Sequence, residues 1–213
     1  MSKRFIAIAG NIGVGKSTLT GKLAEHFAWT PYYEAVDDNP YLADFYQNMK
    51  RWSFHSQIYF LSRRLRHHKD LLSHPNHVVQ DRSVYEDAEI FAGNLFRQGQ
   101  MMDRDYHSYR ELYEVMVELL PPPDLIIYLK ASVPTLIRRI TRRGRDFERG
   151  ISPRYLAQLN QLYDGWIEDF TLCPVLTIDS DALDFVRFAE DFDLIAHQVA
   201  ARLERVEDTQ PSD

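Results

Sequence analysis

The chain has 213 residues, of which 45% are hydrophobic and 26% charged, a composition typical of a globular protein with a buried core. Its 31 acidic residues exceed its 25 basic ones and give a net charge of −6, which argues against non-specific nucleic-acid binding. The single cysteine, Cys173, excludes an internal disulfide and a cysteine-rich zinc site. No apolar run could span a membrane, and Phe5–Ala9 is too short for a signal peptide, so we expect a cytoplasmic protein that binds no membrane.

The charge is concentrated in one segment. Between Arg138 and Arg154 there are seven arginines and two acids, so this segment carries +5 and the remainder must carry −11 to give the total of −6. A run of arginines is most often a solvated helix face. Here Gly144, Gly150 and the two enclosed acids interrupt the helical pattern, which favours a flap that meets an anion.

Short apolar segments alternate with longer amphipathic ones along the chain. The apolar segments have the continuous hydrophobicity of strands in a parallel sheet that is covered on both faces. In chain order, the expected strands are Phe5–Ala9, Tyr32–Val36 (the weakest pattern), His77–Gln80, Leu125–Leu129 and Val175–Ile178. The expected helices are Lys16–Phe27, Pro40–Met49, Trp52–Leu72, Tyr85–Phe96, Asp105–Leu120, Val133–Arg142, Pro153–Phe170 and Asp184–Leu203.

This alternation predicts a single α/β domain over residues 1–203. Its three layers would be a five-stranded parallel sheet and the helices that flank it on both faces. The polar tail from Glu204 is expected to be disordered.

A glycine-rich motif with the spacing G-x-x-x-x-G-K-[ST] lies between the first expected strand and the first expected helix. It consists of Gly10, Asn11, Ile12, Gly13, Val14, Gly15, Lys16 and Ser17, and Thr18 follows it. Glycines let successive backbone N–H groups point at phosphate oxygens, and the helix N-terminus adds to their positive field. The motif predicts an ATP-binding loop in which Lys16 reaches the β- and γ-phosphates and Ser17 is a ligand of Mg²⁺.

A phosphate loop alone does not distinguish a GTPase, an ATPase and a small-molecule kinase. No Asn-Lys-x-Asp guanine motif is present, which disfavours a GTPase. A kinase needs a base, a second Mg²⁺ ligand and cations around the transferred phosphoryl group. Glu34 and Asp81-Arg82 follow expected strands at the carboxyl edge of the sheet, and the arginine segment would form a lid over about residues 142–152. Glu34 could instead be a solvated loop acid, and Asp81 a helix cap.

Five segments follow one another along the chain: GNIGVGKST, Glu34-Ala35-Val36, RWSFHSQIYFLSRRLR, QDRSVYED and RRGRDFERGI. In this order they resemble the deoxyribonucleoside kinase family, most of all its bacterial deoxyadenosine/deoxycytidine kinase branch. The resemblance implies the P-loop kinase fold and an enzyme that uses ATP and Mg²⁺ to phosphorylate the 5′-hydroxyl of a deoxynucleoside. Two positions depart from the animal-type pattern, because Ala35 replaces a proline and Asn39 stands where a tryptophan is usual.

The resemblance also implies the roles of individual residues. Glu34 would be the general base, and the groups around the phosphates would be Lys16, Arg82, Arg139, Arg143 and Arg145. The deoxynucleoside would be held by Tyr46 and Glu148 at the 3′-hydroxyl, by Gln57, Arg64 and Asp87 at the base, and by the apolar walls Trp52, Phe60 and Phe91. Asp81 would hold Mg²⁺ together with Ser17, and Asp184 and Phe185 would lie near the adenine of ATP.

The same likeness bears on substrate and partners. Arg64 with Asp87 is the family's combination for deoxyadenosine, deoxyguanosine or deoxycytidine, so we expect deoxyadenosine first and thymidine last. A homodimer and feedback inhibition by a deoxynucleoside triphosphate are further implications. The alternatives are another phosphate-loop kinase, such as a nucleoside monophosphate kinase, a non-catalytic nucleotide-binding subunit, and a nucleic-acid binder that uses the arginine segment.

Overall fold

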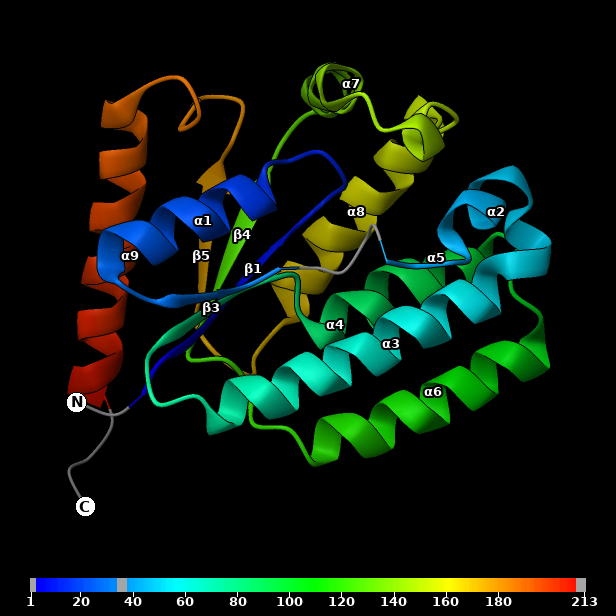
Figure 1. Ribbon diagram of the computed structural model, residues 1–213, viewed down its shortest axis with the longest axis horizontal. Helices are drawn as coiled ribbons and strands as arrows, with labels where there is room; N and C mark the ends of the chain where they lie inside the picture. Colours follow the sequence, from blue (N-terminus) through cyan, green and yellow to red (C-terminus); the bar gives the residue numbers. More distant parts are fainter. Residues whose placement is uncertain (1–2, 34–37, 210–213) are drawn as a thin grey trace.

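The computed structural model describes residues 3–33 and 38–209, which contain a five-stranded parallel sheet with the strand order β2-β3-β1-β4-β5 (Figure 1). The strands are β1 (Phe5–Gly10), β2 (Thr30–Tyr32), β3 (Val78–Asp81), β4 (Leu125–Lys130) and β5 (Val175–Asp179). The predicted fold class is therefore confirmed. The weakest strand ends at Tyr32, and residues 34–36 of the predicted strand lie outside the described residues.

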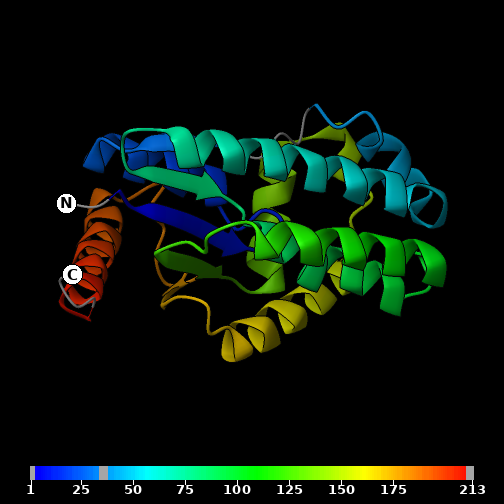
Figure 2. The same cartoon turned by 90° about the horizontal axis from the view of Figure 1, so that it is seen from below.

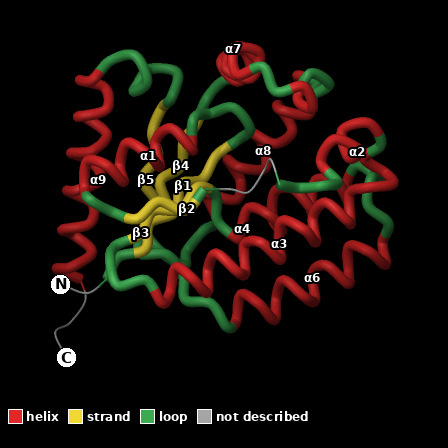
Figure 3. Tube along the Cα trace, viewed as in Figure 1, coloured by secondary structure: helices red, strands yellow, loops and turns green. Residues whose placement is uncertain are grey.

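Both faces of the sheet are buried, as continuous apolar strands require. On β1, Ile6 and Ile8 belong to a core shared with α1 (Lys16–Phe27), α7 (Val133–Arg143) and α9 (Ala189–Thr209). Phe5 and Ala7 point to the other face, where α3 (Met49–Ser73) and α8 (Pro153–Asp169) cover them. Figure 3 shows the strands gathered between α1 and α9 on one side and α3 and α8 on the other.

A further helical layer lies against α3. It contains α2 (Leu42–Gln47), α4 (Val84–Glu86), the π-helix η1 (Asp87–Ala92), α5 (Gly93–Arg97) and α6 (Asp103–Glu118). Buried Leu61 and Tyr109 belong to the core that joins this layer to α3, and α3 and α6 run along each other (Figure 2). The predicted helix over Tyr85–Phe96 is helical throughout, but wider π turns replace α turns over Asp87–Ala92.

The C-terminal helix differs from its prediction at both ends. Asp184–Phe188 forms a turn, and α9 begins only at Ala189, because Phe185 is buried in the core and Asp191 accepts the N–H of Asp184. At its other end α9 continues to Thr209, beyond the predicted helix end at Leu203 and into the segment predicted as a disordered tail. Within the described residues, none of the helices combines the length and apolarity needed to cross a bilayer.

His68 on α3 makes folding sensitive to pH. Its ring is buried edge-to-face against Phe5, with the ring centroids 5.3 Å apart, and burial lowers the pKa of His68 from 6.5 to about 4. The unfolded chain therefore takes up this proton at a higher pH than the folded one. The resulting stabilisation is complete above pH 6.5 and is lost as the pH falls from 6.5 towards 4.

We predict that the free energy of unfolding, measured by urea titration, falls by about 2–3 kcal/mol over this pH window through His68. His68→Leu should make the fall shallower, whereas the same change at the exposed His197 should leave it as it is. An unchanged slope in His68→Leu would contradict this account.

Candidate active site

The phosphate loop joins the end of β1 to the start of α1, at the carboxyl edge of the sheet. Gly10, Gly13 and Gly15 have φ values of 143°, 82° and 110°, a region in which only glycine is unstrained. The buried Lys16 folds back over the loop, where its Nζ donates to the carbonyl of Gly10 at 2.9 Å and to that of Asn11 at 3.1 Å. The loop has the curled conformation that its sequence predicts.

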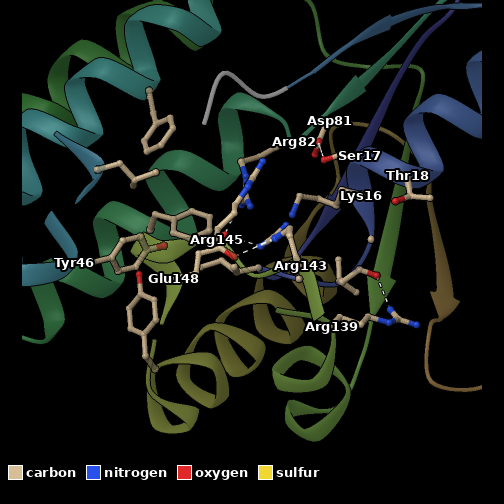
Figure 4. Close-up of a pocket in the computed structure, with 18 of the residues that line it drawn as sticks. Lys16, Ser17, Thr18, Tyr46, Asp81, Arg82, Arg139, Arg143, Arg145 and Glu148 are labelled. Atoms are coloured by element: carbon tan, nitrogen blue, oxygen red, sulfur yellow. Dashed lines mark hydrogen bonds and ion pairs between the residues drawn. The ribbon is translucent and has the colours of Figure 1, made fainter. Parts of the chain in front are cut away.

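A cavity of about 400 Å³ opens above this edge (Figure 4). Phosphate-loop residues, both long helices α3 and α8, the lid segment and the turn before α9 all contribute to its walls. The predicted site residues that line it are Ile12, Gly13, Val14, Gly15, Lys16, Ser17, Thr18, Tyr46, Gln57, Phe60, Asp81, Arg82, Asp87, Phe91, Arg139, Arg143, Arg145, Glu148 and Phe185. Residues 130 positions apart in the chain thus share one cavity, for example Gly15 and Arg145.

A hydroxyl and a carboxylate meet at the start of α1. Ser17 Oγ donates to Asp81 Oδ2 at 2.5 Å, and Figure 4 shows the two side chains facing each other. Parallel pairing sets this proximity, because Asp81 on β3 is in register with Ile8 on β1, next to the loop. Alcohol and carboxylate oxygens are the ligands that Mg²⁺ prefers.

Arg82 occupies an unusual backbone conformation beside this pair. Its φ of 69° is uncommon for a residue other than glycine, and such conformations persist only where the surroundings hold them. Its N–H donates to the carbonyl of Ile8 at 2.9 Å, and its own carbonyl accepts from Arg64 at 3.1 Å. Its guanidinium lies 4.4 Å from the ring centroid of Phe91. The chain therefore turns sharply after β3 and places this cation in the cavity.

A buried ion pair between Arg64 and Asp87 borders the cavity. Arg64 Nε and Nη2 donate to the two oxygens of Asp87 at 3.0 and 3.3 Å, and both side chains are 3% exposed. Asp87 lines the cavity, whereas Arg64 is not part of its lining and contacts it through Asp87 and the carbonyls of Asp81 and Arg82. Close by, Gln57 is buried, and its Oε1 has no hydrogen-bond partner among the described residues. A buried amide oxygen without a hydrogen-bond donor costs folding free energy, so a ligand that donates a hydrogen bond to this wall of the cavity would be favoured.

The arginine segment contains the second half of α7, the short 3₁₀ turn η2 (Asp146–Glu148) and the start of α8. Arg143 donates to both oxygens of the buried Glu148, from Nε at 3.0 Å and from Nη2 at 2.6 Å, and Arg145 lies 3.8 Å from the same carboxylate. Arg139 instead holds the phosphate loop, because its Nη1 donates to the carbonyl of Val14 at 2.6 Å and its Nη2 to that of Ser180 at 2.8 Å. Desolvation by burial lowers the pKa of Arg139.

Several predicted residues lie outside the cavity lining. Gly10 and Asn11 are buried beneath the loop, Trp52 packs beside Tyr41 in the helical layer, and Asp184 caps the turn before α9. Glu34 lies outside the described residues.

Other lining residues were missed by sequence reasoning: Leu42, Phe45, Arg142, Tyr155 and Val186. Four of these are apolar or aromatic residues that the sequence presents as ordinary core positions. Arg142 carried a signal, because it lies in the arginine segment between Arg139 and Arg143.

The model of the deoxynucleoside kinase family matches residues 6–204. The chain belongs to the deoxynucleoside kinase family. It is 40% identical over 198 residues to the deoxyadenosine/deoxycytidine kinase of Bacillus subtilis strain 168, an alignment that covers 92% of this chain and 91% of that one. It is 39% identical over 199 residues to the deoxyguanosine kinase of the same organism, with 92% and 95% covered.

Solved structures of this family also resemble the kinase. The deoxyadenosine kinase from M. mycoides with the products dCMP and a flexible dCDP bound has a TM-score of 0.83 and 30% sequence identity. The same enzyme with bound dATP has a TM-score of 0.81 and 31% identity. Both alignments cover 92% of this chain and 99% of the solved one. The chain is therefore a kinase with the P-loop fold of that family.

A side chain at Gly10 should disturb the phosphate loop. An added Cβ would lie 2.6 Å from the carbonyl oxygen of Leu129, and the φ of 143° would be strained as well. We predict that Gly10→Ala lowers the free energy of unfolding by about 1–3 kcal/mol and weakens nucleotide binding, measured by chemical denaturation and by titration with an ATP analogue.

Gly165 in α8 is the matched control, because an added Cβ there meets nothing within 4 Å. Gly165→Ala should stabilise the protein by about 0.5–1 kcal/mol. Equal stability of the two variants would show that Gly10 is not constrained by its backbone.

Proposed function

We propose that this kinase transfers the γ-phosphoryl group of ATP to the 5′-hydroxyl of a deoxyribonucleoside, with deoxyadenosine as the preferred substrate and deoxyguanosine and deoxycytidine as further ones. One observation carries the proposal. A single cavity joins a phosphate loop to a wall made by Gln57 and Asp87, so a triphosphate and a nucleobase can be held at opposite ends of one space. The family relatives with these three activities support it.

Ser17 and Asp81 are the residues that would hold Mg²⁺. Their oxygens fit an ion that takes few protein ligands and completes its shell with phosphate oxygens and water. No group of three or more His, Cys, Asp or Glu side chains that could hold a metal occurs among the described residues, so an all-protein cage is not available in that part. When bound, Mg²⁺ supplies positive charge to the β- and γ-phosphates.

Glu34 is the proposed general base for the 5′-hydroxyl. The support is its position in the family pattern and in the chain, immediately after the described segment that ends at Tyr33. A carboxylate in hydrogen-bond reach can accept the hydroxyl proton as the oxygen attacks phosphorus. Lys16 and Arg82 would meanwhile stabilise charge on the transferred group.

The sugar and base are proposed to lie between α2 and the lid. Tyr46 and Glu148 both line the cavity and would bind the 3′-hydroxyl. The Gln57 amide offers one acceptor and two donors, so it can accept from the exocyclic amino group of adenine or cytosine and donate to the adjacent ring nitrogen. Phe60 and Phe91 would pack against the base.

Residues 142–152 are proposed to act as a lid. Arg143 pairs with Glu148 in this structure. Binding of both substrates would separate the two side chains, because Arg143 would then bind a phosphate and Glu148 a sugar hydroxyl. Such an exchange lets the arginines reach the transferred phosphoryl group only when a sugar is present, and it excludes water from the reaction. Phe185, which lies near Gly15, would contact the adenine of ATP.

We also propose a cytoplasmic homodimer that a deoxynucleoside triphosphate inhibits. Leu112 and Val115 on α6 and Leu119 directly after it are exposed, which supports self-association through the helical layer. A sedimentation mass of one 25.0 kDa chain would contradict the dimer. The relative from M. mycoides has been solved with dATP and with dCTP bound, which supports feedback by end products. Failure of dATP to inhibit at any deoxyadenosine concentration would argue against that regulation.

Glu34→Gln tests the base assignment. The amide cannot take the hydroxyl proton, so we predict that kcat falls by about 10²–10⁴-fold while the Kd for deoxyadenosine, measured by calorimetry, changes little. Near-normal turnover in this variant would rule out Glu34 as the base.

A substrate panel tests the proposed base recognition. With ATP as donor, we predict that kcat/KM is highest for deoxyadenosine, lower for deoxyguanosine and deoxycytidine, and lowest for thymidine. Gln57→Leu removes the unpaired acceptor and should lower kcat/KM for deoxyadenosine by about 10²-fold or more, since a polar group of the substrate then lacks its partner. A preference for thymidine, or an unaffected Gln57→Leu enzyme, would contradict this reading of the wall.

A further inference from the structure

Glu86 is a fully buried carboxylate to which none of the roles above is assigned. It is the last residue of α4, directly after the turn that carries Arg82 into the cavity. Burying an ionised carboxylate is expensive unless hydrogen bonds and an opposite charge compensate it. Glu86 has both hydrogen bonds and an opposite charge as partners, and these contacts join it to the phosphate loop and to the turn at Arg82.

One oxygen of Glu86 holds the entry to the phosphate loop. Oε1 accepts the backbone N–H of Gly10 at 3.1 Å. The carbonyl of the same glycine accepts from Lys16 Nζ at 2.9 Å. Glu86 therefore holds the residue whose carbonyl accepts the hydrogen bond of the phosphate-loop lysine.

The other oxygen holds the turn after β3. Oε2 accepts the backbone N–H of Ser83 at 2.7 Å and its hydroxyl at 3.1 Å, which completes a capping box at the start of α4. This turn includes Arg82, whose φ of 69° needs support from its neighbours.

The side chain of Arg82 is tied to the same carboxylate. Arg82 Nη1 lies 3.5 Å from Glu86 Oε1 and donates to the hydroxyl of Tyr163 at 2.8 Å. Tyr163 in turn donates to Glu86 Oε1 at 2.7 Å. Both Tyr163 and Glu86 are 0% exposed, so water does not compete for these bonds.

From these contacts we propose that Glu86 is a positioning residue for phosphoryl transfer. It sets the distance between the phosphate loop and the Arg82 guanidinium, with Tyr163 as the connecting hydroxyl. The proposal rests on the proposed function, because it requires Arg82 to meet the transferred phosphoryl group. Misplacing a positioned cation by about 1 Å costs on the order of 10²-fold in rate, so the effect should appear in kcat.

Two substitutions separate the parts of this arrangement. In Glu86→Gln, an NH₂ group replaces one carboxylate oxygen. At the Oε1 position this donor would face two other donors, the Gly10 N–H and the Tyr163 hydroxyl. At the Oε2 position it would face the N–H of Ser83. Tyr163→Phe leaves the Gly10 and Ser83 bonds intact and removes only the hydroxyl that links Arg82 to Glu86. The second variant keeps the test available if the first folds poorly.

Asp124→Asn is the matched control. Asp124 also accepts a backbone N–H from β1, that of Phe5 at 2.7 Å, together with Arg4 Nη1 at 3.3 Å. It lies at the opposite end of the strand from the phosphate loop. Asp124→Asn should therefore lower stability without changing kcat.

The experiment measures kcat and KM for ATP and for deoxyadenosine in wild type and these three variants, well below the melting temperature of each. We expect Tyr163→Phe to lower kcat by about tenfold and Glu86→Gln by about 10²-fold, with both KM values within about threefold of wild type. Unchanged kcat in Tyr163→Phe, or an equal loss in Asp124→Asn, would overturn the positioning role. Inactivity of the wild type on every deoxynucleoside would instead overturn the proposed function on which it rests.

Discussion

Strands β1 and β3 end side by side at a buried carboxylate, that of Glu86, which accepts hydrogen bonds from the last residue of β1 and from the turn after β3. Glu86 accepts the N–H of Gly10, the last residue of β1, and the N–H of Ser83 in the turn after β3. The phosphate loop, the Ser17–Asp81 pair and the strained turn at Arg82 all lie within this junction. The rest of the site is arranged around it, because the parallel sheet brings the two strand ends together before any ligand binds.

The arginine segment illustrates how charge is distributed within the site. The segment has a net charge of +5, but some of its arginines already bind other groups of the protein. Arg139 donates to the carbonyl of Val14 in the phosphate loop, and Arg143 pairs with Glu148. Only part of the positive charge therefore faces the cavity. Arg143 and Arg145, which belong to the proposed lid, pair with Glu148 at the cavity, and an anionic phosphate could compete with Glu148 for them.

The five strands, the phosphate loop and the position of Asp81 and Arg82 after a strand follow from local patterns in the sequence, namely continuous apolar runs and a spaced glycine motif, whereas the order of the strands in the sheet does not. The π-helix after α4 and the turn before α9 do not, because both depend on tertiary packing, of Asp87 against Arg64 in one case and of Phe185 in the core in the other. Glu86 carries a sequence signal, since Ser83 and Glu86 have capping-box spacing, but its contacts with Gly10 and Tyr163 cannot be read from one segment.

The acceptor of the phosphoryl group is expected to be a nucleoside hydroxyl and not a phosphate. The most direct measurement incubates the protein with ATP and Mg²⁺, supplies deoxyadenosine and deoxyadenosine monophosphate in separate reactions, and identifies the products by ³¹P NMR and mass. The account predicts that deoxyadenosine is converted to its 5′-monophosphate with one ADP formed per product, and that the monophosphate is left unchanged. Conversion of the monophosphate to a diphosphate, with deoxyadenosine left unchanged, would contradict it.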